Sequence, residues 1–425
     1  LVAIAALAAF GAQAQSTVGI KGTFDPSLVN QVTTYGGGNV RATTALGNNT
    51  QGTSQVTFFG TEDIGGGLKA NFLLENDFNS TNEAKGNWGN STNANIGNVS
   101  SLGGETYVGL EGRFGDFKVG APNTPSLDVT GRTPFGTKIG SGFSGTRGIG
   151  AQGLGHVREN NAFVYTTPTF AGFTANAMLV ANNKNSNQTT TALTGANTAS
   201  NLASNSTTGG INNQNGWGLG VNYAIQKFYA TANYQALTSK QAYNPNQGYS
   251  FGTTAAGGLS VASNAASTNA GFPAAGYAGG ASTPGTNVQD NQFYVAATYD
   301  FGILKAYAQY INRKVTAQQD TGYYAKRTGE QIGVRSYITP TIEAWASGGM
   351  GRYTSYGSNA ANLTAWQIGS NYWLSKRTNL YAIYGQTGTS NTSLPTALNG
   401  SQTMGTNNPS STNVSNYAVG IRHTF

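Results

Sequence analysis

The chain has 425 residues, of which 9% are charged and 11% aromatic; it contains 60 glycines, and its formal net charge is +7. A disordered chain would lack the aromatic residues, and a soluble helical protein would carry many more charged side chains on its surface. The 23 lysines and arginines form no dense basic run, so no nucleic-acid partner is expected. Abundant Gly, Asn, Thr, Tyr and Phe are instead typical of β-strands joined by polar loops.

Metal and disulfide chemistry have little support in the composition. The chain has no cysteine, which excludes disulfides and thiolate metal sites. Its two histidines, His156 and His423, have no partner at metal-ligand spacing. No metal and no cofactor is therefore expected.

The first residues, LVAIAALAAFGAQAQS, are an apolar run followed by the A-x-A pattern of a signal-peptide cleavage site. A run of about a dozen apolar residues is too short to cross a bilayer as a helix. We expect residues 1–14 to be the remnant of a signal peptide and residues 15–425 to form a single domain. The alternative is a buried N-terminal strand or helix.

Alternation of apolar and polar residues with a period of two recurs in stretches of about ten residues. The last stretch, NYAVGIRHTF, sets Tyr417, Val419 and Ile421 on one face and Asn416 and Arg422 on the other. Residues 68–75, 228–235 and 303–312 alternate in the same way. These stretches predict β-strands with one apolar and one polar face.

The connections between these strands alternate between short and long. Seven short turns are expected at residues 63–67, 113–115, 168–172, 225–227, 300–302, 338–341 and 375–377. Eight long loops rich in Asn, Ser, Thr and Gly are expected at residues 25–55, 80–104, 123–158, 181–215, 238–291, 313–326, 353–364 and 386–415. Fifteen connections join sixteen strands.

A soluble sandwich would also have alternating strands, but it has no reason to separate long loops from short turns, and long structureless loops are uncommon in one. A transmembrane β-barrel has an even number of strands, short periplasmic turns and long external loops. Its backbone groups are all paired within the closed sheet. The sequence therefore predicts an all-β, 16-stranded antiparallel transmembrane barrel with a water-filled lumen.

Several segments resemble the Gram-negative general porins, most closely those of beta-proteobacteria. They run from the first strand to the end of the chain: GTEDIGGGLKANFLLEN (60–76), TYVGLEGRFGDFKVG (106–120), PFGT (134–137), VYTTPTFAGF (164–173), NYWLSKRTNLYAIYG (371–385) and NYAVGIRHTF (416–425). The resemblance implies a homotrimer in the bacterial outer membrane, in contact with its lipid and lipopolysaccharide. It also implies passive passage of small hydrophilic solutes, and a third loop folded into the barrel as a constriction. In this family a terminal aromatic residue resembles the signal read by the barrel-assembly machinery, a role expected for Phe425. The alternative is an aromatic residue of the interfacial girdle.

By chain order the third loop covers about residues 123–158. Its expected constriction residues are the one acidic and four basic side chains Asp128, Arg132, Lys138, Arg147 and Arg158. Basic side chains in a narrow pore favour anions, so we expect a mild anion preference. The alternative for each basic residue is an ion pair with a carboxylate of the wall. Residues 131–138, GRTPFGTK, approach the phosphate-loop pattern, but Thr137 and Lys138 stand in the wrong order and no strand-to-helix context surrounds them.

Strand parity directs a second set of charged side chains to the lumen wall. The basic ones are Lys21, Lys69, Lys118, Lys305, Arg335 and Arg422, and the acidic ones are Glu75, Asp77, Glu111 and Glu343. Three positions at which the family commonly has arginine differ: SQVTF (54–58), Gly104 before the 106–112 strand, and VGAP (119–122). Their absence argues against strong anion selectivity.

Three other functions fit some of the features. A substrate-specific outer-membrane channel would share the fold, and an adhesin would use the long Asn- and Thr-rich loops. An outer-membrane enzyme would need a catalytic histidine, but His423 falls on the predicted lipid face. We therefore expect a channel without enzymatic activity.

Overall fold

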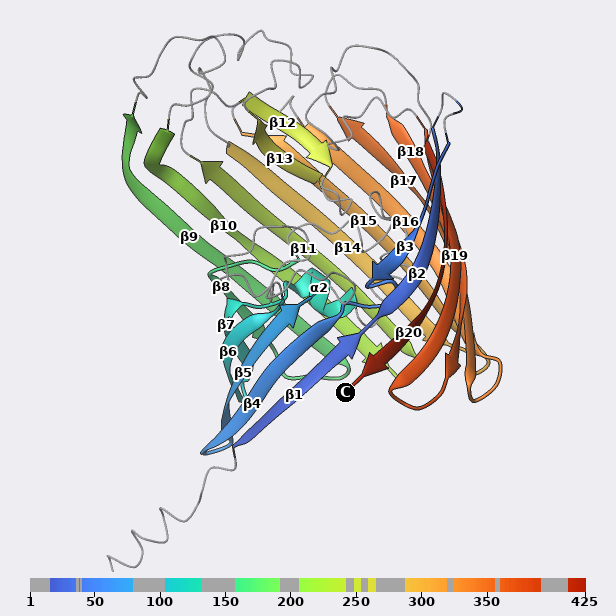
Figure 1. Cartoon of the computed structure of the whole chain (residues 1–425). Coiled ribbons are helices and arrows are strands. Elements are labelled where there is room, and N and C mark those ends of the chain that lie inside the picture. Colours follow the sequence, from blue (N-terminus) through green and yellow to red (C-terminus); the bar gives the residue numbers. More distant parts are fainter. Residues whose placement is uncertain are drawn as a thin grey trace, which may run out of the picture.

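A computed structural model describes residues 16–35, 38, 40–78, 104–130, 157–191, 206–241, 248–253, 259–264, 287–318, 324–355, 360–390 and 412–425. The expected signal-peptide remnant lies outside these residues. Within them, nearly every element is a strand of one antiparallel sheet that closes on itself (Figure 1). No helix in the described ranges is long and apolar enough to cross a membrane.

The elements follow one another in this order: β1 (Thr17–Phe24), β2 (Pro26–Tyr35), β3 (Val40–Asn48), β4 (Gln55–Gly65), β5 (Leu68–Asp77), β6 (Thr106–Gly112), β7 (Gly115–Ala121), α2 (Pro125–Thr130), β8 (Ala162–Thr166), β9 (Phe173–Thr191), β10 (Ser206–Ile225), β11 (Phe228–Gln241), β12 (Gly248–Thr253), β13 (Leu259–Asn264), β14 (Asn287–Asp300), β15 (Lys305–Ala317), β16 (Tyr324–Tyr337), β17 (Ile342–Ser355), β18 (Ala361–Trp373), β19 (Thr378–Thr389) and β20 (Thr412–Thr424). The strands β12 and β13 form a separate hairpin. The other eighteen strands form the barrel wall.

Eighteen strands fill sixteen positions because two positions are each shared by two strands. Both β1 and β2 pair with β20 in one continuous register, with Phe24 opposite His423 and Ser27 opposite Gly420. In turn β3 pairs with β2, and β4 pairs with β1. The strands β1 and β2 therefore share the first strand position of the barrel, and β3 and β4 share the second. The prediction of sixteen strands is confirmed.

The pleat of each strand directs apolar side chains outward and polar side chains inward. On β20, Tyr417, Val419 and Ile421 are 49%, 49% and 42% exposed, whereas Asn416 and Ala418 are buried. The outward apolar band suits lipid, and the inward polar rows leave an aqueous lumen. The predicted face assignment of this strand is confirmed.

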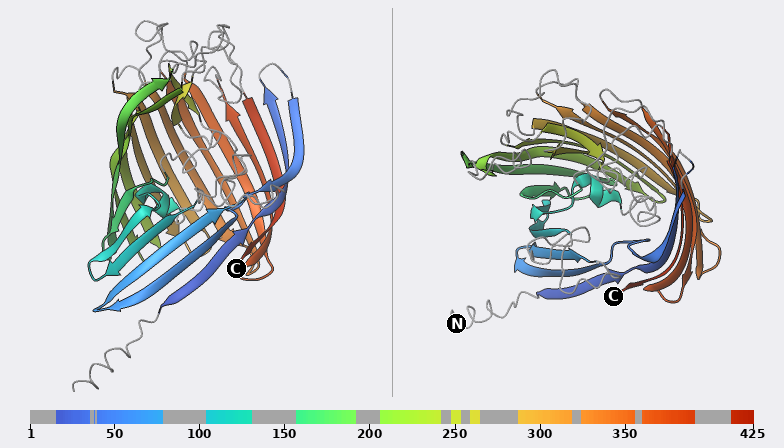
Figure 2. Two further views of the ribbon diagram at one scale, coloured as in Figure 1. Left: turned by 60° about the vertical axis from the view of Figure 1, so that its left-hand side comes forward. Right: turned by 45° about the horizontal axis from the view of Figure 1, so that its top comes forward.

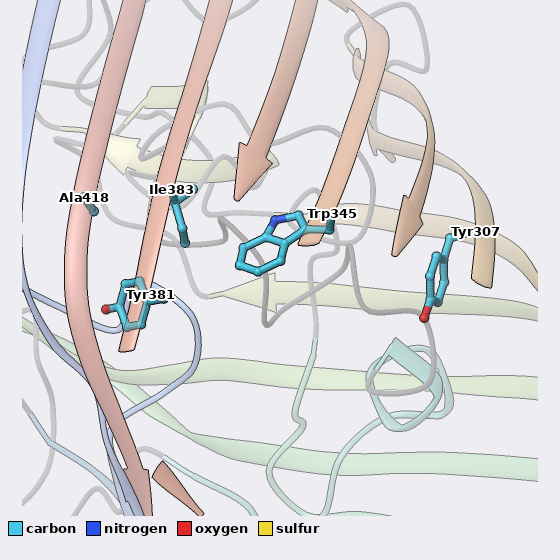
Figure 3. Close-up of a cluster of buried hydrophobic side chains, with 5 residues drawn as sticks. All are labelled: Tyr307, Trp345, Tyr381, Ile383 and Ala418. Carbon is cyan, nitrogen blue, oxygen red and sulfur yellow. The ribbon is translucent and has the colours of Figure 1, made fainter. Parts of the chain in front are cut away.

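The inner wall also carries an aromatic cluster. Tyr307, Trp345, Tyr381, Ile383 and Ala418 are buried on the inner faces of β15, β17, β19 and β20 (Figure 3). The indole of Trp345 lies on Gly369, where an added Cβ would be 2.2 Å from the ring. These large side chains thicken the wall on this side and narrow the lumen.

The wall is uneven in height. The strands β5, β6, β7 and β8 have 10, 7, 7 and 5 residues, whereas β9 and β10 have 19 and 20. Figure 2 shows the short strands as a low side of the barrel beside the tall remainder. The seven predicted short turns join the strands at one end, and in the first of them Gly66 and Gly67 have φ of 64° and 80°, which other residues rarely adopt.

The loop boundaries differ from those predicted. Residues 25–55 were expected to be one long loop, but 26–35 and 40–48 are strands. Strands also extend into the expected loops at 181–215, 238–291, 313–326, 353–364 and 386–415. The reason is that strand ends beyond the apolar band meet water on both faces, so their hydrogen-bond ladder continues although the alternation in sequence fades.

Candidate pore constriction

The third loop enters the barrel as a helix. The helix α2 contacts the inner side of β9, β10 and β11, and both views of Figure 2 show it inside the ring. Gly220 on β10 leaves room for it, since a Cβ added there would lie 3.3 Å from the Cβ of Pro125. Asp128 on this helix is exposed. The predicted constriction residues Arg132, Lys138 and Arg147 lie outside the described residues.

The two ends of this loop are joined to each other. Asn123 and Arg158 form a β-bridge, and the Thr124 amide donates to the carbonyl of Val157 at 3.0 Å. The Arg158 Nε donates to Asn123 Oδ1 at 2.9 Å. The two ends of the loop therefore meet at one point of the wall.

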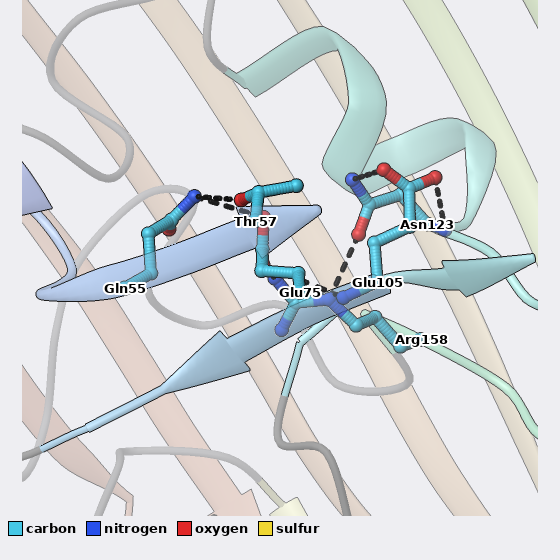
Figure 4. A network of polar contacts seen from close by, with 6 residues as sticks. All are labelled: Gln55, Thr57, Glu75, Glu105, Asn123 and Arg158. Carbon is cyan, nitrogen blue, oxygen red and sulfur yellow. Dashed lines mark hydrogen bonds and ion pairs between the residues drawn. The ribbon is translucent and has the colours of Figure 1, made fainter. Parts of the chain in front are cut away.

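Two carboxylates of the wall hold that base (Figure 4). Glu75 on β5 accepts from the Arg158 guanidinium at 3.1 Å and from Gln55 Nε2 at 2.9 Å. Glu105, just before β6, accepts from the backbone amide and the side-chain amide of Asn123 at 3.1 and 3.2 Å. Both glutamates are largely buried, where a charge-assisted hydrogen bond is stronger than at an exposed site.

Arg158 thus sits in an ion pair with a wall carboxylate, the alternative that the sequence left open for each basic residue of the loop. Its side chain remains 28% exposed, so it is still in reach of water. Glu75 compensates the positive charge that the sequence assigned to the constriction. A pore-lining role for Arg158 stays a prediction.

The lumen wall on this low side is acidic. Lys118 lies 3.9 Å from Glu105 and 3.8 Å from Asp116, and its ammonium group is 4.6 Å from the Tyr107 ring centroid. Strand pairing places Lys69, Glu111 and Asp116 side by side on β5, β6 and β7. The inner faces of these strands and the base of the loop carry six carboxylates (Glu75, Asp77, Glu105, Glu111, Asp116 and Glu159) against three cations (Lys69, Lys118 and Arg158).

On the opposite wall, basic residues are cross-strand neighbours of one another. Lys305 on β15 is the direct neighbour of Arg335 on β16, and Arg313 is the direct neighbour of Arg327 further up the same two strands. Arg335 lies 3.1 Å from Glu343, and buried Arg313 forms a bidentate ion pair with buried Asp290. Like charges placed side by side are tolerated because these carboxylates compensate them.

The sequence analysis missed Arg313, Arg327, Asp290 and Glu105, because it assigned them to loops or loop edges. Arg313 continues the inward row of Lys305, Tyr307, Gln309 and Ile311. Extending that row past the expected loop boundary would have found it. Glu105 gave no such signal, because it precedes a strand and is positioned by contacts with the loop.

The remaining predicted residues lie at the closure of the barrel. Lys21 on β1 lies over the Phe59 ring at 5.3 Å, and Arg422 on β20 lies against the backbone of Gly52. Phe425 exchanges two backbone hydrogen bonds of 3.1 Å with Gly22, and its ring is 6.1 Å from that of Phe24. The last residue therefore helps to close the barrel, and its role as an assembly signal stays a prediction.

A closed barrel with a polar lumen and a loop inserted from one wall is the architecture of an outer-membrane channel. A family model described as Gram-negative porin matches residues 1–392, so the chain belongs to the Gram-negative porin family and to the bacterial outer membrane. The expected family, fold class and localisation are confirmed.

Two curated relatives are similar to parts of the chain. Outer membrane porin protein 32 of Delftia acidovorans is 36% identical over 182 residues, which are 41% of this chain and 47% of that protein. An outer membrane porin protein of Bordetella pertussis is 32% identical over 128 residues, which are 30% of each chain. The chain spans about half or less of the length of the curated relatives it matches.

Solved structures share the fold over nearly the whole chain. An anion-selective porin from Comamonas acidovorans matches 97% of this chain and 100% of that chain with a TM-score of 0.60 at 21% identity. The outer membrane channel DcaP of Acinetobacter baumannii matches 96% of this chain and 97% of that chain, with a TM-score of 0.55 at 12% identity.

Proposed function

We propose that this chain is a general diffusion porin through which small hydrophilic solutes and ions cross the outer membrane passively. The observation that carries the proposal is the lumen itself. Its inner faces are polar along the strands, and α2 enters it from one wall. A sixteen-stranded barrel is wide enough to hold a water-filled channel, and an inserted segment limits the solute size.

Reconstitution in planar bilayers tests this function. The purified protein is expected to insert as stable, open channels whose current is proportional to voltage and rises with salt concentration. Stable insertion without open channels would overturn the proposal. Saturable block of the current by one solute, and by none of its close analogues, would favour a substrate-specific channel instead.

We also propose a mild preference for anions. Among the described residues, Lys21, Lys69, Lys305 and Arg422 have no ion pair, whereas Lys118, Arg158, Arg313 and Arg335 do. These four cations and Arg132, Lys138 and Arg147 of the third loop outnumber the luminal carboxylates that have no ion pair among the described residues, Asp25, Asp77, Glu111 and Asp128, so the lumen keeps a modest positive balance. The fold relative from Comamonas acidovorans is described as anion-selective, which supports the same sign.

Reversal potentials in a KCl gradient measure this preference. The wild type is expected to pass Cl⁻ somewhat better than K⁺, and the double variant Lys138→Gln, Arg147→Gln is expected to lower the Cl⁻/K⁺ permeability ratio. The matched control replaces two cations on the outward face, Lys314→Gln and Lys326→Gln, and should leave the ratio unchanged. A clear preference of the wild type for K⁺ would contradict the proposal.

We propose that the functional unit is a homotrimer joined along the low side of the barrel. Apolar side chains face outward there, among them Phe58, Leu74, Val108, Phe117 and Phe163. Short strands shorten the lipid contact, so a neighbouring subunit is a better cover for them than lipid. One structure of OmpT from Vibrio cholerae is described as a trimer form. Light scattering of the detergent-solubilised protein, corrected for bound detergent, tests the stoichiometry.

We propose no catalytic activity beside transport. The relatives that match are porins. His423 faces outward near the end of β20, where its Nδ1 lies 2.9 Å from the Thr378 hydroxyl, and a hydroxyl and an imidazole alone lack the orienting carboxylate of a hydrolase site. Hydrolysis of ester or peptide substrates by the folded protein would contradict this.

A further inference from the structure

Besides the third loop, a second segment leaves the wall toward the lumen. It consists of residues 49–54, which connect β3 to β4 (hereafter the seam segment). Pro26 is opposite Asn48, and Thr23 is opposite Gln55. Two residues therefore separate these pairs on one strand and six on the other. The four extra residues cannot stay in the sheet. Thr50, Gln51 and Ser54 are buried. Thr50 bonds the Ser27 hydroxyl of β2 at 2.6 Å, and Gln51 bonds side chains of β18 and β19.

Asp25 fixes the backbone of the seam segment. One carboxylate oxygen accepts from the amides of Gln51 and Gly52 at 2.6 and 2.7 Å, and the other accepts from the Tyr381 hydroxyl at 2.5 Å. The Asp25 amide donates to the Ser54 hydroxyl at 3.1 Å, and the Asp25 carbonyl accepts from the amide of Asn49 at 3.0 Å. Successive amides that converge on one carboxylate hold a loop in a single conformation.

Gln51 ties the seam segment to the last strands of the barrel. Its Nε2 donates to Asn371 Oδ1 on β18 at 2.5 Å, and its Oε1 accepts from Asn379 Nδ2 on β19 at 3.0 Å. Gly52 lies against β20, since a Cβ added to it would be 3.4 Å from Arg422 Nε. The segment is thus fastened across three strands by groups more than 300 residues away in the chain.

The seam segment lies across the lumen from α2. When the sixteen strand positions are counted from the shared position of β1 and β2, α2 contacts the seventh to ninth (β9, β10 and β11). The seam segment contacts the fourteenth to sixteenth (β18, β19 and β20). Both lie in the half of the barrel near the short turns. Asn371 is two residues from the end of β18, Asn379 is the second residue of β19, and Gly220 is five residues from the end of β10.

Thr53 is the most exposed residue of this region. Within residues 47–54, Thr53 alone is exposed, while Thr50, Gln51, Gly52 and Ser54 are buried against the wall. We propose that the seam segment is a second constriction element of the pore, opposite the third loop, with Thr53 at its tip on the solute path. This inference rests on the proposed channel function and names a residue that limits the solute.

Because the chain has no cysteine, one introduced thiol gives a unique label. The test variant is Thr53→Cys. The matched variants are Asp128→Cys on α2, which reports on the third loop, and Ser375→Cys in the exposed turn between β18 and β19, which lies outside the lumen. Each is treated in the bilayer with two methanethiosulfonate reagents of similar size, one cationic and one anionic.

Modification of Thr53→Cys is expected to lower the single-channel conductance by roughly a third, because added bulk at a narrow zone controls the resistance of a pore. The anionic label should also lower the Cl⁻/K⁺ ratio relative to the cationic one. Modified Ser375→Cys should conduct like the wild type. Two results would overturn the inference: a mass shift that proves labelling of Thr53→Cys with unchanged conductance, or failure of the reagents to reach that thiol in the open channel. If the unmodified wild type forms no channels, it is the proposed function that fails.

Discussion

The two inward segments of this barrel are fastened in chemically opposite ways. The base of the third loop is held by an ion pair and charge-assisted bonds between Arg158, Asn123, Glu75 and Glu105, and Arg158 remains partly exposed. The seam segment is held by one fully buried carboxylate, Asp25, and by neutral amides and hydroxyls. A partly exposed ion pair responds to salt and to the solute, whereas a buried network around a single carboxylate is shielded from both. The third loop is therefore the adjustable side of the constriction, and the seam segment is its rigid side.

The largest effect is expected from removing the carboxylate of the rigid side. Asp25→Ala leaves the amides of Gln51 and Gly52 and the Tyr381 hydroxyl without their acceptor in a buried site. We expect the free energy of unfolding to fall by about 3 kcal/mol. Urea titration of the detergent-solubilised protein measures it, with exposed Glu62→Gln as the control. A loss no greater than that of the control would show that the seam segment is not held by Asp25.

A smaller loss of stability, but a change in permeation, is expected at the adjustable side. Glu75→Gln keeps the shape and removes the charge that pairs with Arg158, so the free energy of unfolding should fall by about 1 to 2 kcal/mol. The freed guanidinium should raise the Cl⁻/K⁺ permeability ratio measured from reversal potentials, and the change should shrink at high salt. Glu330→Gln, which removes an outward carboxylate, is the control. An unchanged ratio would mean that Arg158 does not face the solute path.

The two inward segments differ in how tightly a glycine at each of them is packed. A Cβ at Gly220 would lie 2.1 Å from Asn233 Oδ1 and 3.3 Å from the Pro125 Cβ, whereas one at Gly52 would first meet Arg422 Nε at 3.4 Å. Gly220→Ala should therefore cost about 1 kcal/mol through displacement of buried Asn233 and of α2, and Gly52→Ala less than half of that. Urea titration of both variants measures these two changes in the free energy of unfolding. Equal costs would contradict the closer packing around Gly220.

The smallest effect is expected at the cation beside the seam segment. Arg422→Gln removes one of several unpaired luminal charges, so the Cl⁻/K⁺ ratio should fall less than twofold, with little change in conductance. Outward-facing Arg352→Gln is the matched control. A rise in the ratio would contradict the luminal position of Arg422, because loss of a cation from the lumen cannot favour Cl⁻.

Much of the wall follows from local sequence. Alternation with a period of two identifies strands such as 416–425 and assigns their faces, because a β-strand places successive side chains on opposite sides. The glycines at 65–67 mark a tight turn because the backbone there has positive φ. The count of sixteen and the inward position of Lys118 or Arg335 follow from these local rules.

The constriction does not follow from local rules. Residues 25–55 are mostly polar, with a few apolar residues such as Leu28, Val32 and Leu46. This local pattern does not distinguish a loop from the strands β2 and β3 or from the seam segment. Arg158 has the same sequence signature whether it is free in the lumen or paired with Glu75. These outcomes depend on which residues the closed ring brings together.

The amino-acid sequence by itself therefore determined the barrel, its number of strands, its two faces and its family, since each of these follows from patterns among residues close together in the chain. Only the tertiary structure decided which charges are compensated and which segments fill the lumen. Asp25 and Tyr381 are 356 residues apart in sequence but 2.5 Å apart in space. Such a contact exists only when the first and last strands pair and the barrel closes.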